Sequence, residues 1–168
     1  MVEEAHRVQG MSAVSARHAE MPAAVTAFFT AESWMVNDLD DAPVAAVRGG
    51  YRGESGEWYV DVLWHDDVEQ LVIHSTAPKP IPEDRTAAVA GYLTFVNYGL
   101  PIGNFELSPL TGSVRVKTGL AVGANDLTED IVARQVYANV MTMDRYLPGI
   151  VQVVWGTDPA DAYTAIDG

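Results

Sequence analysis

The stretch TAAVAGYLTFVNYGLPIGNF, from Thr86 to Phe105, contains no charged residue. Two prolines precede it and Pro101 interrupts it, so we expect a helix from Glu83 to Tyr98. Apolar residues recur at helical spacing and predict a core-facing stripe of Val89, Leu93, Val96 and Leu100. The other side of this helix is also uncharged, so it needs a second cover. Since Pro101 ends the helix and Asn97 and Asn104 lie in the second half of the stretch, we do not expect a membrane span.

In the first half of the chain, side chains alternate in polarity with a period of two, as is typical of strands. Trp58, Val60, Val62 and Trp64 alternate with Tyr59, Asp61, Leu63 and His65, and a similar pattern runs from Leu71 to Thr76. The connections are of hairpin length, and a third strand is predicted from Val44 to Tyr51. These segments predict an antiparallel meander with one face more polar than the other.

The remaining segments complete an alternating order of helices and strands. A short amphipathic helix is expected from Pro22 to about Ser33, followed by a polar break over residues 37–41. A hairpin is expected after Asn104, with Gly112 at positive φ in its turn. A third helix should begin within Asp126 to Glu129 and run to about Tyr146. Pro148 and Gly149 should break or kink it, with Ile150 to Trp155 continuing as helix or strand.

The predicted fold class is therefore α+β, in the order α-β-β-β-α-β-β-α, with one antiparallel sheet and helices mainly on one face. Residues 1–21 are interpreted as a frayed or partly helical segment, and residues 22–168 as a single domain.

Composition limits the function classes further. The chain has 168 residues, no cysteine and a net charge of −13. Missing cysteines exclude disulfides and thiolate metal sites, and they fit a reducing cytoplasm. The acidic balance disfavours direct binding to nucleic acid and could attract a basic protein.

Three short segments resemble the YbjN family: Asn97 to Leu107, Gly112 to Arg115, and Asp144 to Pro148. That family is similar in fold to class I type III secretion chaperones. The resemblance implies a bacterial, cytoplasmic protein- or peptide-binding domain, often homodimeric, with no enzymatic activity and no cofactor. The matching segments are structural motifs, so they do not identify a client.

Candidate partner-binding residues come from two parts of the chain. The first is the aromatic set Phe28, Phe29 and Trp34 on the first helix and just after it. The second is the acidic set Asp61, Asp66, Asp67 and Glu69 in the predicted hairpin. The acidic set leaves open an alternative, a regulator that docks on a basic, nucleic-acid-binding protein.

A second alternative is a small enzyme that uses His65, Asp66 and His74, if the two histidines face each other across the hairpin. No third strong ligand is fixed by the spacing, so we predict no metal, no cofactor and no catalytic residue.

Assembly is predicted from the uncharged side of the second helix, which carries Gly91, Thr94, Phe95 and Tyr98. Small residues beside aromatic ones suit close approach by another helix. Few elements are left in the chain to cover this side. The third helix could cover it within one chain, but we favour a two-fold homodimer through it.

Overall fold

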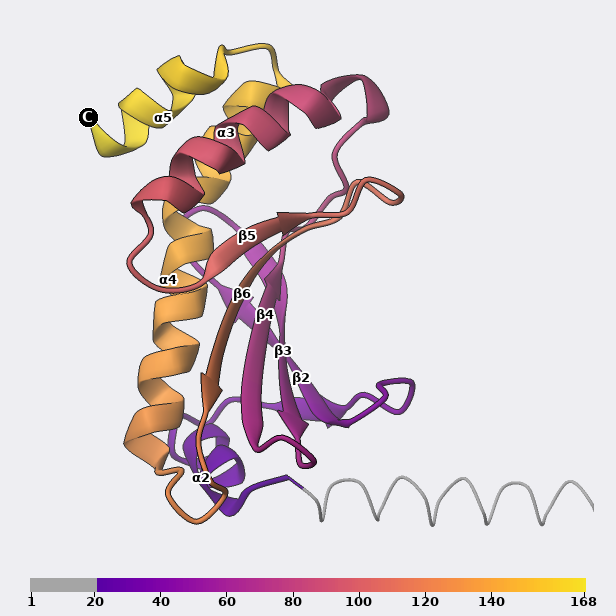
Figure 1. Ribbon diagram of the computed structural model, residues 1–168, viewed down its shortest axis with the longest axis vertical. Coiled ribbons are helices and arrows are strands. Elements are labelled where there is room, and N and C mark those ends of the chain that lie inside the picture. Colours follow the sequence, from indigo (N-terminus) through magenta and orange to yellow (C-terminus); the bar gives the residue numbers. More distant parts are fainter. Residues whose placement is uncertain (1–20) are drawn as a thin grey trace, which may run out of the picture.

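The computed structural model describes residues 21–168, which form one six-stranded antiparallel sheet with helices packed against one of its faces (Figure 1). The strands are β1 (Val36–Asp38), β2 (Ala45–Arg52), β3 (Glu57–His65), β4 (Gln70–Thr76), β5 (Asn104–Leu107) and β6 (Val114–Ala121), in the spatial order β1-β2-β3-β4-β6-β5. The helices are α2 (Ala23–Ala31), the 3₁₀ turn η1 (Glu83–Arg85), α3 (Thr86–Gly99), α4 (Glu129–Val154) and α5 (Pro159–Asp167). The predicted α+β class is confirmed. Of the N-terminal segment predicted over residues 1–21, only Met21 lies within the described residues, and it is buried.

The two faces of the sheet differ as the alternation predicts. Trp58, Val60, Val62 and Trp64 of β3 are buried in the core beneath the helices. The opposite face is not covered by any helix in the described part of the chain (Figure 1). It carries ion pairs instead, including a two-point contact between Arg48 and Asp61.

Helix α4 runs through Pro148 to Val154, so of the predicted break or kink the break is wrong, and Ile150 to Val154 continue as helix. Proline has no backbone N–H, so the Asp144 carbonyl loses the donor that residue 148 would normally supply. The Ser55 hydroxyl donates to that carbonyl at 2.6 Å instead. A side chain from the β2–β3 turn therefore replaces the missing helical hydrogen bond, and the helix continues.

Helix α3 has the predicted core stripe, and its second cover is α5. Gly91 lies against Pro159, and the rings of Phe95 and Tyr163 stack with centroids 5.9 Å apart. The expectation that few elements remained to cover this side was therefore wrong, because the terminal helix folds back onto it (Figure 1). No helix among the described residues is long and apolar enough to cross a membrane.

Two further local predictions concern the turn at Gly112 and the segment that contains β1. The predicted positive φ of Gly112 is confirmed at 70°, and the residue sits against the Ile81 backbone. The polar break predicted at residues 37–41 is partly a strand, since β1 pairs Asn37 with Arg48 and Asp38 with Val47 at the edge of the sheet.

Candidate protein-binding groove

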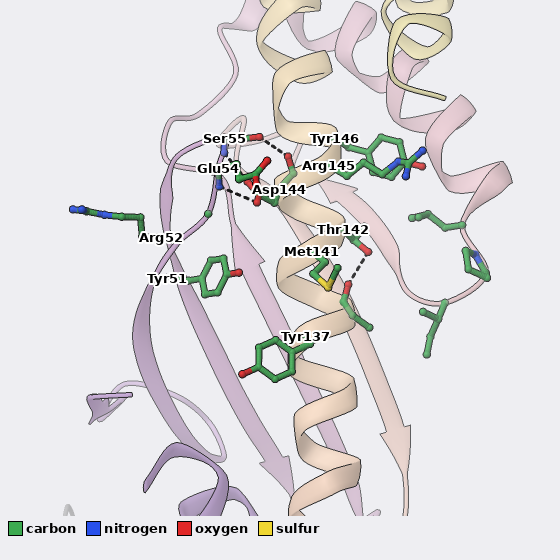
Figure 2. A pocket seen from close by; sticks show the side chains of 15 residues that line it. Tyr51, Arg52, Glu54, Ser55, Tyr137, Met141, Thr142, Asp144, Arg145 and Tyr146 are labelled. Carbon is green, nitrogen blue, oxygen red and sulfur yellow. Dashed lines mark hydrogen bonds between the residues drawn. The ribbon is translucent and has the colours of Figure 1, made fainter. Parts of the chain in front are cut away.

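A large open hollow lies over the solvent side of α4. We call it the α4 groove, with a volume of about 1230 Å³. Three segments line it: residues 51–55 at the β2–β3 turn, Leu100 to Ile102 after α3, and α4 residues Tyr137, Ala138, Met141, Thr142, Asp144, Arg145 and Tyr146. Figure 2 shows α4 between the other two segments.

Helical periodicity places these side chains. Val136, Val140 and Met143 are buried against the sheet, so Tyr137 and Met141 point away from it. Met141 is 64% exposed and Tyr137 is 37% exposed. Ile102, on the far wall, is 43% exposed. The groove therefore presents an aromatic ring, a flexible thioether and an aliphatic side chain to solvent, a combination suited to irregular apolar partners.

Asp144 fixes one wall of the groove. Its Oδ2 accepts from the Glu54 N–H at 2.9 Å and its Oδ1 from the Ser55 N–H at 2.7 Å. A Cβ at Gly53 would lie 2.5 Å from Oδ1, so the turn can approach only with glycine there. Figure 2 shows these bonds joining the turn to α4. Asp144 and Ser55 thus hold the turn in place, and both carboxylate oxygens already have donors.

Aromatic packing supports Tyr51 and Tyr137 in the α4 groove. The Tyr51 ring lies 5.6 Å from that of Trp34, and the Tyr137 ring lies 6.0 Å from that of Phe28. The Tyr137 hydroxyl donates to Glu32 at 2.6 Å, and this bond, with some burial, raises the pKa of Tyr137 to about 12. Tyr137 therefore stays protonated and is held in one orientation at physiological pH.

Two residues of the predicted aromatic set are buried behind Tyr51 and Tyr137, whereas the third, Trp34, remains partly exposed. Phe28 and Phe29 are buried at 1% and 5% exposure. Trp34 is half-buried, and its indole N–H donates to the Gly50 carbonyl at 2.6 Å. Phe28 and Phe29 are thus not exposed to a partner, because they fill the space between α2, α4 and the sheet.

The predicted acidic set is divided between two places. Asp61 is buried on the helix-free face of the sheet and is paired with Arg48 at 2.6 Å. Asp66, Asp67 and Glu69 lie exposed in the β3–β4 connection. None of the four lines the α4 groove.

The register separates the residues of the enzyme alternative. His65 pairs with Gln70, whereas His74 pairs with Asp61, which lies four positions before His65 in β3. That offset corresponds to roughly 13 Å along a strand. Residues 21–168 contain no cluster of three or more His, Asp or Glu side chains suited to a metal ion. His65, Asp66 and His74 therefore do not converge.

The predicted dimer residues form a strip on α3. Gly91 is half-buried under Pro159, whereas Thr94 is exposed, Phe95 is 45% exposed and Tyr98 is 96% exposed. The strip is thus only partly covered by α5.

Sequence reasoning missed Tyr51, Tyr137, Met141 and Ile102. A usable signal was present for two of them. Tyr137 and Met141 are one turn apart and lie off the stripe of Val132, Val136 and Val140, so they mark a second apolar line on α4.

Comparison with known proteins adds only a partial similarity of fold. The chain is similar to a chain in the crystal structure of the ExsC–ExsE complex, at 15% identity and a TM-score of 0.41, over 58% of this chain and 74% of that one. No family model matches, so the similarity to the YbjN family remains a resemblance. No curated protein matches the chain either. Neither a partner nor a function follows from a similarity at this level.

Proposed function

We propose that this chain is a non-enzymatic protein- or peptide-binding domain with a chaperone-like or regulatory role in the cytoplasm. The observation that carries the proposal is the α4 groove, an open hollow with exposed Tyr137, Met141 and Ile102. Its polar groups near α4 are engaged within the fold, since Asp144 and Ser55 bond to each other's backbone. Apolar contact with a protein segment is what such a surface offers.

Affinity capture tests this proposal. The wild-type chain and a Met141→Glu variant would be used as bait at low and at high salt. We expect a partner that is retained at high salt by the wild type and lost with the variant, because apolar burial is not screened by salt. A partner held equally by both proteins would contradict binding in the α4 groove.

A homodimer through α3 is the second part of the proposal. Like charges oppose self-association in a chain of net charge −13, so an uncharged surface is where two copies can approach. The exposed side chains Thr94, Phe95 and Tyr98 supply such a surface. Gly91 is a poor site for a test, because Pro159 lies against it.

Sedimentation velocity of a Thr94→Glu/Tyr98→Glu variant tests the homodimer. Both side chains are exposed, so the fold should be retained while the dimer becomes a monomer. A wild-type chain that sediments as a monomer at tens of micromolar would rule the homodimer out.

An acidic regulator that docks on a basic protein is a second candidate function. One end of the sheet collects acidic side chains from two connections that touch, since Glu69 accepts from the Ala124 N–H at 3.4 Å. The acids at this end include Asp66, Asp67, Glu69, Asp126, Glu129 and Asp130. Amide replacements of Asp66, Asp67 and Glu69 should then slow association and flatten its salt dependence. Unchanged kinetics would mean that these acids serve solubility alone.

A further inference from the structure

A second hollow shares only Ser55 with the α4 groove. It has a volume of about 390 Å³ and lies between residues 77–82, which link β4 to η1, and the C-terminal half of α4. We call it the proline–tryptophan groove. One wall contains Pro78, Pro80, Ile81 and Pro82, and the other contains Leu147, Ile150, Val151, Val154 and Trp155.

Two of its side chains are unusually exposed. Trp155 is 85% exposed and Val151, one helical turn earlier, is 46% exposed. Both line the hollow together with the buried Leu147 and Ile150, so the apolar surface of α4 extends from the core to the outside. An exposed tryptophan beside a preformed apolar hollow is the kind of anchor that dominates the energy of protein interfaces.

The backbone of the groove excludes one mode of peptide binding. Prolines at three positions have no N–H, while the N–H groups of Ala77 and Ile81 already donate to Val114 and Gly112, each at 2.8 Å. Only Lys79 of this wall retains a donor for an incoming strand, and the other wall is a helix with internally bonded backbone. Addition of a partner strand is thus disfavoured, and an amphipathic helix that binds through side chains fits better.

The charged residues around the groove indicate which net charge the partner helix should carry. Exposed acids adjoin the lining residues along the chain, with Glu54 before Ser55, Glu83 and Asp84 after Pro82, and Asp158 shortly after Trp155. The bases within three residues of the lining are Arg52, Lys79, Arg85 and Arg145, and the guanidinium of Arg85 already donates to the Val153 carbonyl. The same range also contains Glu57 and Asp144, so six acids against four bases give the surroundings a negative balance, which favours a basic partner.

We propose that the proline–tryptophan groove binds a basic amphipathic helix of a partner protein. The apolar face of that helix packs on Trp155 and Val151, and its lysine or arginine side chains face Glu54, Glu83 and Asp84. This inference rests on the protein-binding function proposed above and adds a second site with a defined chemistry.

A pair of synthetic peptides tests the inference. The probe is an amphipathic helix of about 14 residues, roughly four turns, made of leucine and lysine, and its counterpart replaces lysine with glutamate. Binding is measured by calorimetry and by the indole ¹⁵N–H signal of Trp155. We expect the leucine–lysine peptide to shift that signal and to bind at least about tenfold more tightly than its counterpart.

Variants locate the binding. Trp155→Ser should weaken the leucine–lysine peptide at least about tenfold, and its high exposure means that folding should be retained. Met141→Ser, in the α4 groove, should leave the affinity unchanged. Equal binding of both peptides, or an affinity unaffected by Trp155→Ser, would overturn the inference. Loss of binding in Met141→Ser alone would also overturn it while leaving the proposed protein-binding function intact.

Discussion

Gly112 shows how one residue can fix a hairpin against its neighbour. Its φ is 70°, and a Cβ there would lie 2.3 Å from the Ile81 carbonyl oxygen. Gly112→Val should therefore lower the free energy of unfolding by at least about 2 kcal/mol, through backbone strain and a clash with a main-chain atom. Chemical denaturation measures the loss.

Gly50→Val is the matched control. Gly50 lies within β2 at an ordinary φ, and a Cβ there would meet no atom within 4 Å. We expect a change within about 0.5 kcal/mol, because a β-branched residue suits a strand. Similar losses in both variants would show that the Gly112 turn is not constrained as described.

Ser55 and Pro148 are predicted to be energetically coupled. The Ser55 hydroxyl donates a hydrogen bond to the Asp144 carbonyl, and Pro148 has no backbone N–H that could donate to it. Ser55→Ala should cost about 1–2 kcal/mol in the wild-type chain, since the carbonyl loses its donor. In a Pro148→Ala background, residue 148 supplies its own N–H, so the same change should cost less.

A double-mutant cycle by urea denaturation measures this coupling. We expect an interaction energy of at least about 0.5 kcal/mol between the two positions. Strictly additive losses would mean that the hydroxyl does not replace the missing helical bond.

At the scale of elements, burial in β4 and charged side chains on β3, β5 and β6 together set the pKa of His74. Burial, aided by Arg115 and Lys117 and opposed by Glu106 and Asp61, lowers the pKa of His74 to about 4. Its Nε2 is buried without a hydrogen-bond partner among the described residues. The folded chain therefore holds this imidazole neutral where a free histidine would begin to take up a proton.

A stability profile against pH tests this arrangement. In the unfolded chain a histidine binds a proton below about pH 6.5. In the folded chain His74 binds a proton only below about pH 4. The unfolding free energy should thus fall as the pH drops from about 6.5 to about 4, and His74→Gln should reduce that fall. Equal slopes in the two proteins would show that His74 titrates in the folded chain as it does in the unfolded one.

The elements that could be predicted are those with a strong local pattern. Alternation in β3 and the apolar stripe of α3 each fix a burial pattern without knowledge of their neighbours. The sequence left helix and strand open for the segment after Pro148, because the donor to the Asp144 carbonyl is Ser55, about ninety residues earlier in the chain. The cover of α3 by α5 was missed for a similar reason, since packing partners are not encoded in periodicity.

At the scale of the whole molecule, the candidate site was harder to predict than the fold. Aromatic type alone favoured Phe28 and Phe29, yet both fill the core between α2 and α4. The apolar residues that line the α4 groove come from three separate segments, at Tyr51, Ile102 and Met141. Only the tertiary arrangement brings these segments together, so the spacing of Tyr137 and Met141 marks one line of the groove and not the groove as a whole.

Site-specific photo-crosslinking tests the central claim most directly. A photoreactive phenylalanine derivative would replace Met141 in the α4 groove and, as a control, Leu110, which is 94% exposed at the β5–β6 turn outside the groove. Irradiation of cells that produce each variant, followed by mass spectrometry, should give a covalent adduct with another polypeptide at position 141 and none at position 110. No adduct at position 141, or equal adducts at both positions, would contradict the assignment of the α4 groove as a protein-binding site.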